Sequence, residues 1–367
     1  MPSKRVNPEM LILAREAHGF TQAELAAAAG ISQGKLSKYE NGLLVVAEED
    51  VGVMAKALGY CADFFFQTDR IYGLGSSSLF HRQRQSVPMQ AQRQIQAKIN
   101  ILRMQVDRLL RGVEIDSEYA FEPMDVEAFD GNAERIAQLL RIAWQLPLGP
   151  VGNVTTAIEN AGGIVLKCNF GTSKIDAAHL WVTGLPPLFF MNGGTSADRY
   201  RFTLAHELGH AIMHRAPTGD IEAEADRFSA EFLMPAREVT THLANLSIQR
   251  VAALKPHWRV SMAALVRRAR DVGAITQRHY QTLFQRLSSL GYRTNEPVQI
   301  ADEQPTAFRR LVEVYQQAHG YTRADMDRLL FTVDPEFFSW HGLQQPTQVR
   351  ITVPPSQNSM RFDRQVK

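Results

Sequence analysis

The chain has 367 residues, of which 45% are hydrophobic and 21% charged, a composition typical of globular proteins and not of disordered or fibrous ones. Its 40 basic and 38 acidic side chains nearly cancel, so any nucleic-acid site must be local. No segment approaches the roughly 18 unbroken apolar residues of a membrane span, and the basic start runs into an amphipathic pattern without an apolar signal core. Two cysteines, Cys61 and Cys168, cannot form a disulfide framework and are expected in the core. We therefore expect a cytoplasmic protein of two or three domains without a membrane partner.

The first block of the chain predicts short helices separated by glycine-containing turns. Thr21 and Glu24 have the spacing of a capping box. Ser32 is placed to cap the next helix, which ends at Gly42. Two short helices joined by AGIS have the spacing of a helix-turn-helix unit, and a further helix near residues 47–58 would close the small core.

The middle of the chain changes from helical to extended patterning. Residues 76–94 are polar and indicate a linker or connecting arm, after which helical patterns follow at 97–110, 133–144 and 151–160. Beyond the Gly162-Gly163 pair, three short apolar runs predict the strands of a small sheet: residues 164–166, 179–182 and 188–191. Helices resume at about Asp198 and continue to about Phe338. The Gln- and Pro-rich remainder, from Leu343, is expected to be largely disordered.

The sequence HELGH, from His206 to His210, is the most informative motif. In a helix, residues four apart project from one face, so both imidazoles can reach one ion. One arc of about 100° holds Thr203, His206, Glu207, His210 and His214, and the opposite arc is apolar. The same pattern also arises by chance on solvated helix faces, but the clean hydrophobic back of this helix favours a metal site.

A hydrolytic zinc site usually takes three protein ligands, so a third is required. The candidates lie in IEAEADRFSAEFLMP. Projected as a helix, this segment has an apolar stripe through Ala225, Phe228 and Phe232, with Glu224 and Glu231 along its edge, whereas Glu222 and Asp226 are expected to point the other way. Helical phase therefore leaves Glu224 and Glu231 as alternatives.

HELGH followed by EADRFSAEFLMP, with RYRFTLA before it, resembles the ImmA/IrrE family of metallo-endopeptidases. The resemblance implies that Glu224, the glutamate before Ala-Asp, is the third zinc ligand, and leaves Glu231 as a supporting or packing residue. Zn²⁺ held by His206, His210 and Glu224 would lower the pKa of a bound water to about 7. Glu207 would take the proton of that water and deliver it to the leaving amine.

Two further features of the peptidase site are expected from the sequence. His214, His179 and Tyr200 are candidates for stabilising the oxyanion, with a purely structural role as the equal alternative. An extended substrate would pair with a free sheet edge, for which the strand at residues 188–192 is the candidate, by analogy with zincin architecture.

TQAELAAAAGISQGKLSKYENG is similar to the helix-turn-helix of the Xre/Cro repressor family. The side chains suited to phosphate and base contacts in a major groove are Gln22, Gln33, Lys35, Ser37 and Lys38. A solvated face of a protein-binding module is the alternative, because few strong cations are present. Such domains commonly pair on two half-sites, so a homodimer on operator DNA is expected. Residues 258–287 also predict a helix-turn-helix-like pair, which either reads DNA through Arg267, Arg268 and Arg270 or caps the peptidase core.

The expected fold is multidomain and mainly α: an all-α helix-turn-helix domain, an α+β zincin-like domain with a small sheet, and a helical C-terminal region. The expected limits are 1–70 for the DNA-binding domain, 71–115 for a linker and connecting helix, 116–240 for the peptidase, 241–340 for the C-terminal helices and 341–367 for a disordered tail. The expected function is a transcriptional regulator whose zinc endopeptidase cleaves a regulatory protein such as a repressor. The alternative is a transcription factor that uses the zinc domain as a sensor or scaffold.

Overall fold

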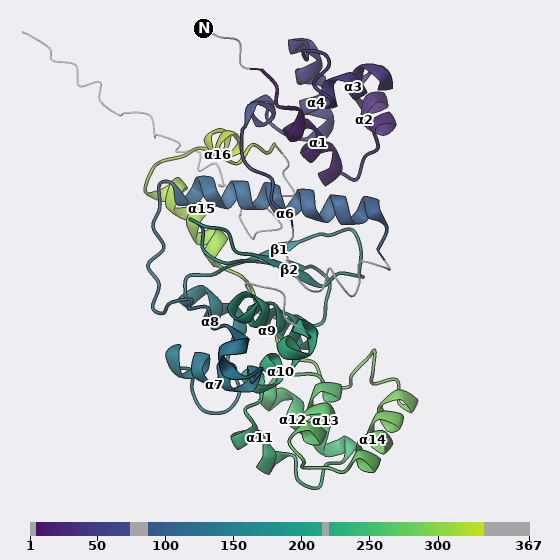
Figure 1. The fold of residues 1–367 in the computed structure, drawn as a ribbon, viewed down its shortest axis with the longest axis vertical. Helices are drawn as coiled ribbons and strands as arrows, with labels where there is room; N and C mark the ends of the chain where they lie inside the picture. Colours follow the sequence, from purple (N-terminus) through teal and green to yellow (C-terminus); the bar gives the residue numbers. More distant parts are fainter. Residues whose placement is uncertain (1–4, 74–86, 215–219, 334–367) are drawn as a thin grey trace, which may run out of the picture.

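The structure, a computed structural model, describes residues 5–73, 87–214 and 220–333. Its parts are stacked along the long axis of the molecule (Figure 1). N-terminal helices lie at one end, a long helix separates them from a small sheet, and further helices follow beyond the other face of the sheet. The expected fold class, mainly helical with one small sheet, is confirmed for the described part. The tail at 341–367 lies outside the described residues.

The described part of the N-terminal unit is entirely helical. The expected capping box is present, since Thr21 accepts from the backbone of Glu24 while the Glu24 carboxylate accepts from the backbone of Thr21, and Ser32 caps the third helix. Tyr39 is buried, and its hydroxyl donates to Asp50 at 2.5 Å. The elements are α1 (Pro8–Ala17), α2 (Gln22–Ala29), α3 (Gln33–Glu40), α4 (Glu48–Leu58) and the 3-10 helix η1 (Ala62–Phe66).

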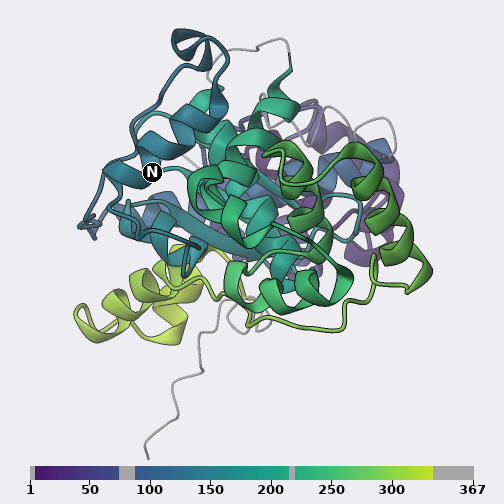
Figure 2. The same cartoon turned by 90° about the horizontal axis from the view of Figure 1, so that it is seen from below.

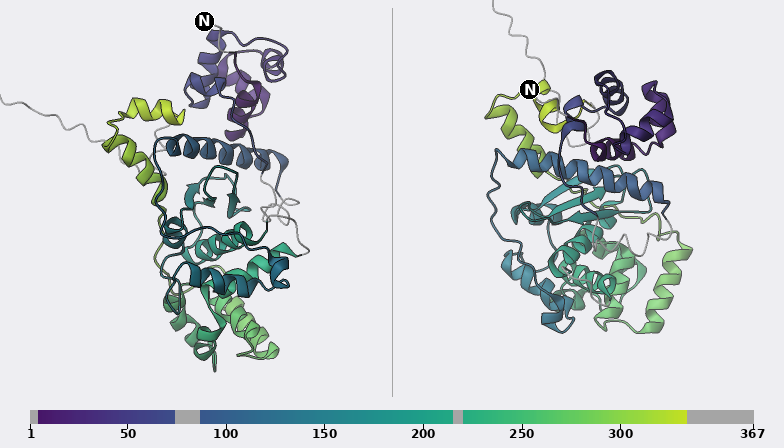
Figure 3. Two further views of the ribbon diagram at one scale, coloured as in Figure 1. Left: turned by 60° about the vertical axis from the view of Figure 1, so that its left-hand side comes forward. Right: turned by 45° about the horizontal axis from the view of Figure 1, so that its top comes forward.

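The long helix α6 (Met89–Leu110) is shared by two hydrophobic cores. Ile101 and Met104 pack into the core of the N-terminal helices, whereas Ile99 and Val106 pack against the sheet. Both views of Figure 3 show α6 between these two layers. Burial on two faces makes α6 the structural connection between the ends of the molecule.

The first turns of α6 lie in a stretch that the sequence marks as polar linker. The helix begins at Met89, not near Ala97, and residues 74–86 lie outside the described part. The Gln90 side chain donates to the carbonyl of Gly19 at 2.6 Å, and Gln94 donates to that of Ala17. The polar composition here therefore reflects side-chain contacts with the N-terminal domain.

The sheet consists of β1 (Ile164–Cys168), β2 (Ala177–Leu180) and β3 (Leu188–Asn192) in the order β1-β3-β2. β3 pairs parallel with β1 and antiparallel with β2. Alternate side chains pack on opposite sides, as in Val165 toward the helices below the sheet and Leu166 toward α6. The expectation that β3 offers a free edge is wrong, because β3 is the central strand. Its fully buried, continuous apolar run is the pattern of a strand covered on both faces.

Beyond the sheet, the described helices share one continuous core. The Arg268 side chain, 5% exposed, donates to the Glu231 carboxylate and the Met234 carbonyl, so part of the face that would read DNA is buried and the contact favours the expected cap. The elements are η3 (Val126–Phe129), α7 (Ala133–Ala143), α8 (Val154–Asn160), α9 (Ala197–Met213), α10 (Ile221–Leu233), α11 (Ala236–His242), α12 (Ile248–Trp258), α13 (Met262–Asp271) and α14 (Gln277–Ser289).

The last described helices, α15 (Ala307–Gln317) and α16 (Arg323–Leu330), return to α6 and the N-terminal domain. Figure 2 shows them on a different side of the molecule from α12–α14. Phe331 packs edge-on against Phe64, and Tyr60 pairs with Thr332 in an antiparallel bridge. Within the described ranges, no helix is both long and apolar enough to cross a membrane.

Candidate metal centre and nucleic-acid interface

Helix α9 carries HELGH and packs against α10 and β2. Leu204, Ala205 and Leu208 are buried on its apolar side. At Gly209 the helices approach so closely that a Cβ atom would lie 2.9 Å from Cδ1 of Phe228 on α10. Glycine at this position therefore lets the first turns of α10 reach the histidine-bearing face of α9.

His206 and His210 face one another through their Nε2 atoms, which are 2.9 Å apart. On the far side of its ring, Nδ1 of His206 lies 3.0 Å from the Asp226 carboxylate. Because a carboxylate only accepts, this Nδ1 must carry the hydrogen, which leaves the Nε2 of a neutral ring with its lone pair toward His210. Such an outer carboxylate is the usual partner of a metal-binding histidine.

A second carboxylate supports His210 through an intermediate ring. Nδ1 of His210 lies 2.7 Å from Nδ1 of His214, and Nε2 of His214 lies 3.0 Å from the Glu224 carboxylate. Glu224 again fixes the hydrogen, here on Nε2 of His214, so His214 accepts at Nδ1 from His210. Nε2 of His210 thus carries a lone pair directed at Nε2 of His206, and the neutral form of His206 directs a second lone pair to the same point.

Glu222 supplies the nearest carboxylate to that point, at 3.7 Å from Nε2 of His206 and 3.9 Å from Nε2 of His210. The ligand atoms of these three residues lie within 4.8 Å of one another. The expectation that Glu222 and Asp226 point away from the histidines is wrong. At about 100° per residue, Glu222 and Glu231 lie equally far from the middle of the apolar stripe, on opposite sides of it, so phase alone could not exclude Glu222.

The other candidate ligands from the sequence occupy different places. Glu224 contacts His214 as described above, and its assignment as a zinc ligand stays a prediction. The Glu231 carboxylate accepts from Gln138, Arg268 and the backbone of Ala236. Glu231 therefore secures the junction of α10, α11 and α13.

Glu207, the candidate base, is fully buried beside the two histidines. Its Oε2 lies 2.7 Å from Nδ1 of His179, which β2 directs toward α9, while its Oε1 has no hydrogen-bond partner among the described residues. Of the proposed oxyanion stabilisers, His179 thus contacts the base, whereas the hydroxyl of Tyr200 pairs with Thr155 at 3.2 Å. An unpartnered buried carboxylate oxygen marks a place where another polar species belongs.

The electrostatics of the pair also suit a cation. Burial lowers the pKa of His206, but hydrogen bonds to Asp226 and Glu222 outweigh it and raise the pKa to about 9. Burial, with His206 nearby, lowers the pKa of His210 well below its ordinary value. The surrounding carboxylates therefore stabilise positive charge at the point where the two Nε2 atoms meet.

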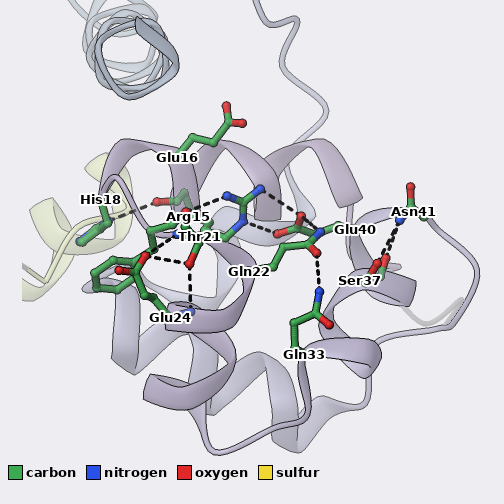
Figure 4. A network of polar contacts seen from close by, with 12 residues as sticks. Arg15, Glu16, His18, Thr21, Gln22, Glu24, Gln33, Ser37, Glu40 and Asn41 are labelled. Atoms are coloured by element: carbon green, nitrogen blue, oxygen red, sulfur yellow. Dashed lines mark hydrogen bonds and ion pairs between the residues drawn. The ribbon is translucent and has the colours of Figure 1, made fainter. Parts of the chain in front are cut away.

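Among the candidate DNA-reading side chains, Gln22 lies at the start of α2, and Gln33 and Ser37 lie on α3 (Figure 4). Lys35 and Lys38 also belong to α3. Nε2 of Gln33 donates to Oε1 of Gln22 at 3.0 Å, and Nε2 of Gln22 donates to Glu40 at 2.8 Å. Arg15 donates to the same Glu40 carboxylate at 2.6 and 3.0 Å. Buried Glu40 therefore fixes the orientation of Gln22, which in turn orients exposed Gln33.

The remaining candidate side chains of α3 differ in availability. Lys35 forms an ion pair with Asp50 at 2.5 Å, and the hydrogen bond with Asp50 raises its pKa. The Ser37 hydroxyl lies 3.5 Å from the Asn41 side chain, and Lys38 is exposed. Lys38 is therefore better placed than Lys35 to meet a phosphate.

Two protein-family models match the chain, one over the candidate metal centre and one over the N-terminal helices. A family model described as an IrrE N-terminal-like domain matches residues 158–270, and one described as a helix-turn-helix domain matches residues 11–62. The chain joins a helix-turn-helix domain to an IrrE N-terminal-like domain. None of the curated proteins compared with the chain matches it.

The IrrE N-terminal-like domain belongs to a metallopeptidase family and includes the sheet, α9, α10 and most of α13. Within it, the contacts of Glu222 and Asp226 with His206 contradict the orientation expected from the sequence, and His214 was considered as an oxyanion stabiliser. A usable signal was present, because Glu222 and Asp226 are four residues apart and so share a helix face, as His206 and His210 do. The chain is thus a regulator with a DNA-binding helix-turn-helix domain and a protease-like domain.

Proposed function

We propose that the protein is a zinc-dependent endopeptidase that is directed to DNA and cleaves a regulatory protein. One observation carries the proposal. The Nε2 atoms of His206 and His210 face each other at 2.9 Å beside a buried carboxylate, while the opposite nitrogens of both rings have partners. This arrangement suits a metal ion with three protein ligands, the usual number in hydrolytic zinc sites.

The contacts favour His206, His210 and Glu222 as the ligands. Glu224, the ligand implied by family resemblance, has a second role available, because it accepts from His214 and so orients His210. Asp226 does the same for His206 directly. In this proposal one carboxylate binds the metal and two others hold its histidines, as outer partners of metal ligands do.

When bound, zinc would polarise the scissile carbonyl and acidify a water molecule. Glu207 would accept a proton at the buried oxygen Oε1, which has no other hydrogen-bond partner among the described residues, and return it to the leaving amine. His179 would hold Glu207 in place by donating to Oε2. A base confined on one side by His179 keeps its other oxygen directed at the reaction site.

The helix-turn-helix domain gives the proposed substrate its context. A protease held at an operator would meet proteins that also bind there, so a repressor is the proposed substrate. A homodimer matched to two half-sites and a cytoplasmic location remain predictions from the sequence. The sensor or scaffold alternative requires the metal and the DNA contacts but no base at Glu207.

The direct test is incubation of the purified protein with repressors encoded beside its gene, followed by mass spectrometry of the products. Wild type should produce fragments that Glu207→Gln does not, although both should contain one zinc per chain. Glu127→Gln, the same chemical change at an exposed position, should cleave like wild type.

Three results would count against the proposal. Equal cleavage by wild type and Glu207→Gln would remove Glu207 as the base. A wild-type protein without bound zinc after refolding with the metal would remove the metal site. Zinc binding and DNA binding without any Glu207-dependent fragment would favour the sensor alternative.

A further inference from the structure

A large cleft of about 1410 Å³ opens between α9, α10 and the helices of the C-terminal region. Its walls come from the first half of α9, from α10 and α13, and from the segment after α14. The cleft therefore lies where the peptidase core meets the cap formed by α12–α14.

One end of this cleft lies beside the candidate metal centre, although His206, His210 and Glu222 are not among the residues that line it. Thr203, one helical turn before His206, lines it, and so does Asp226, whose carboxylate lies 3.0 Å from His206. Asp226 thus belongs both to the cleft wall and to the support of a metal-binding ring. A chain held in the cleft would pass beside the proposed reaction site.

The lining is rich in charge, with seven basic and five acidic side chains. Most of these charges have partners. Lys255 lies between Asp198 and Glu296 at 2.7 and 2.6 Å. Four arginines also have carboxylate partners. The pairs are Arg270 with Asp271, Arg227 with Glu134 at 3.5 Å, Arg199 with Asp176 and Arg268 with Glu231.

Two guanidinium groups differ from the rest. Arg267 on α13 and Arg293 after α14 are exposed, and neither forms an ion pair with a carboxylate of the described residues. A guanidinium presents a planar fork of donors that matches a carboxylate. These two residues therefore give the solvent side of the cleft two guanidinium groups that form no ion pair with the described residues.

We propose that this cleft binds an acidic segment of the substrate protein, next to the bond that is cleaved. The inference rests on the proposed peptidase function and adds the class of sequence that the enzyme selects. Arg267 and Arg293 would pair with Asp or Glu side chains of an extended segment, whose backbone follows α9 toward His206. Carboxylates of the substrate would thus form the ion pairs that these two arginines do not form within the described residues.

An acidic peptide suits the cleft better than a nucleic acid does. The carboxylates of Asp271, Glu134 and Glu296 also line it, and they would repel a duplex that carries one negative charge per ~1.7 Å of its axis. A peptide can place its few acidic side chains at the two arginines and neutral residues elsewhere.

The test uses full-length Glu207→Gln protein, so that binding is measured without hydrolysis. Fluorescein-labelled ten-residue peptides of alternating Glu and Ala, or of Gln and Ala, are titrated at low salt and followed by fluorescence anisotropy. The Glu peptide should bind at least about tenfold more tightly than the Gln peptide, and the difference should shrink at high salt. Added Arg267→Glu and Arg293→Glu changes should remove the preference.

Arg286→Glu is the matched control, because Arg286 is exposed on α14 and does not line the cleft. It should change the affinity less than about twofold. An unchanged Glu preference in the double variant, an equal loss in Arg286→Glu, or competition by a 20-base-pair duplex as effective as by free peptide would overturn the proposal.

A photo-crosslinking measurement on otherwise unmodified Glu207→Gln protein covers the case in which the double variant is misfolded. A benzophenone on the Glu peptide should label α13 or the segment after α14, and labelling confined to other elements would refute the cleft as the site. Loss of this preference with intact Glu207-dependent cleavage would remove only the present inference. Peptide binding without cleavage would instead remove the proposed function.

Discussion

His210 and His214 lie one helical turn apart at the end of α9, with their Nδ1 atoms 2.7 Å from each other. Because His214 also contacts Glu224, Glu222 and Glu224 of α10 should differ in their effect on metal binding. We expect Glu222→Gln to lower zinc affinity more than about a hundredfold, as loss of a ligand should. Glu224→Gln should lower it about ten- to a hundredfold, as loss of an outer partner does. Competition with a chromophoric chelator measures both, and the reverse order would restore Glu224 as the ligand.

Because His179 contacts Glu207, changing His179 should lower the turnover rate without affecting metal binding. His179→Ala should keep zinc but reduce kcat by about ten- to a hundredfold, since the base loses its orienting donor. KM should change little, because the contact that His179 makes in the structure is with Glu207. His179→Gln can still donate and should recover part of the rate. Loss of zinc together with activity in His179→Ala would point to a structural role instead.

Gly209→Ala should damage the metal centre without touching a ligand. The added Cβ would lie 2.9 Å from Phe228, so α9 and α10 must separate, at a cost of about 1–3 kcal/mol in unfolding free energy. Zinc affinity should fall as Glu222 recedes. Gly52→Ala on α4 is the control, because nothing lies within 4 Å of its Cβ position, and it should stabilise the protein by up to about 1 kcal/mol. Urea unfolding distinguishes the expected decrease in unfolding free energy for Gly209→Ala from the expected increase for Gly52→Ala.

The network of Figure 4 predicts how the helix-turn-helix reads DNA. With one amide hydrogen of Gln33 donated to Gln22, the other hydrogen and Oε1 suit the N7 and N6 positions of an adenine. Gln33→Ala should cost about 1–3 kcal/mol and relax the preference at one base pair. Lys38→Ala should weaken binding to all sequences and reduce the salt slope by about one. Operator binding measured at several salt concentrations separates these outcomes, and identical profiles for both variants would contradict the assignment.

The buried Lys255 predicts a defined pH dependence. Burial raises the pKa of Asp198, but the hydrogen bonds from Lys255 and Ser196 and the charge of Lys255 together outweigh it and lower the pKa below its ordinary value. A carboxylate whose pKa is lowered in the folded protein stabilises the fold at pH values above its ordinary pKa. This stabilisation is lost as the pH falls through the lowered pKa. Lys255→Met leaves Asp198 and Glu296 without their partner and should cost about 3–5 kcal/mol at pH 7. Its deficit in urea unfolding should shrink toward pH 3, and a deficit that grows on acidification would refute this account.

Local signals in the sequence predicted much of the fold. Thr21, Glu24 and Ser32 cap their helices as expected because capping depends only on neighbouring residues. The early start of α6 was hidden, since Gln90 and Gln94 satisfy carbonyls of a domain about 70 residues away. Contacts of that range leave no periodic trace in the chain.

The candidate site was predictable only where it depends on the local helical pattern. His206, Glu207 and His210 follow from one helical face, whereas the choice among the glutamates of α10 depends on how that helix crosses α9. The close approach at Gly209 decides it, because it brings Glu222 and Asp226 to the histidines. Packing between helices, and not phase within one helix, sets the geometry.

The bridge between Tyr60 and Thr332 also has a consequence for biosynthesis. At ribosomal speeds of about 5–20 residues per second, roughly 15–55 s pass between the appearance of these two residues. During that interval the DNA-binding helices lack the Phe331 contact with Phe64. A nascent chain would therefore acquire its final N-terminal packing only after Phe331 and Thr332 have been synthesised.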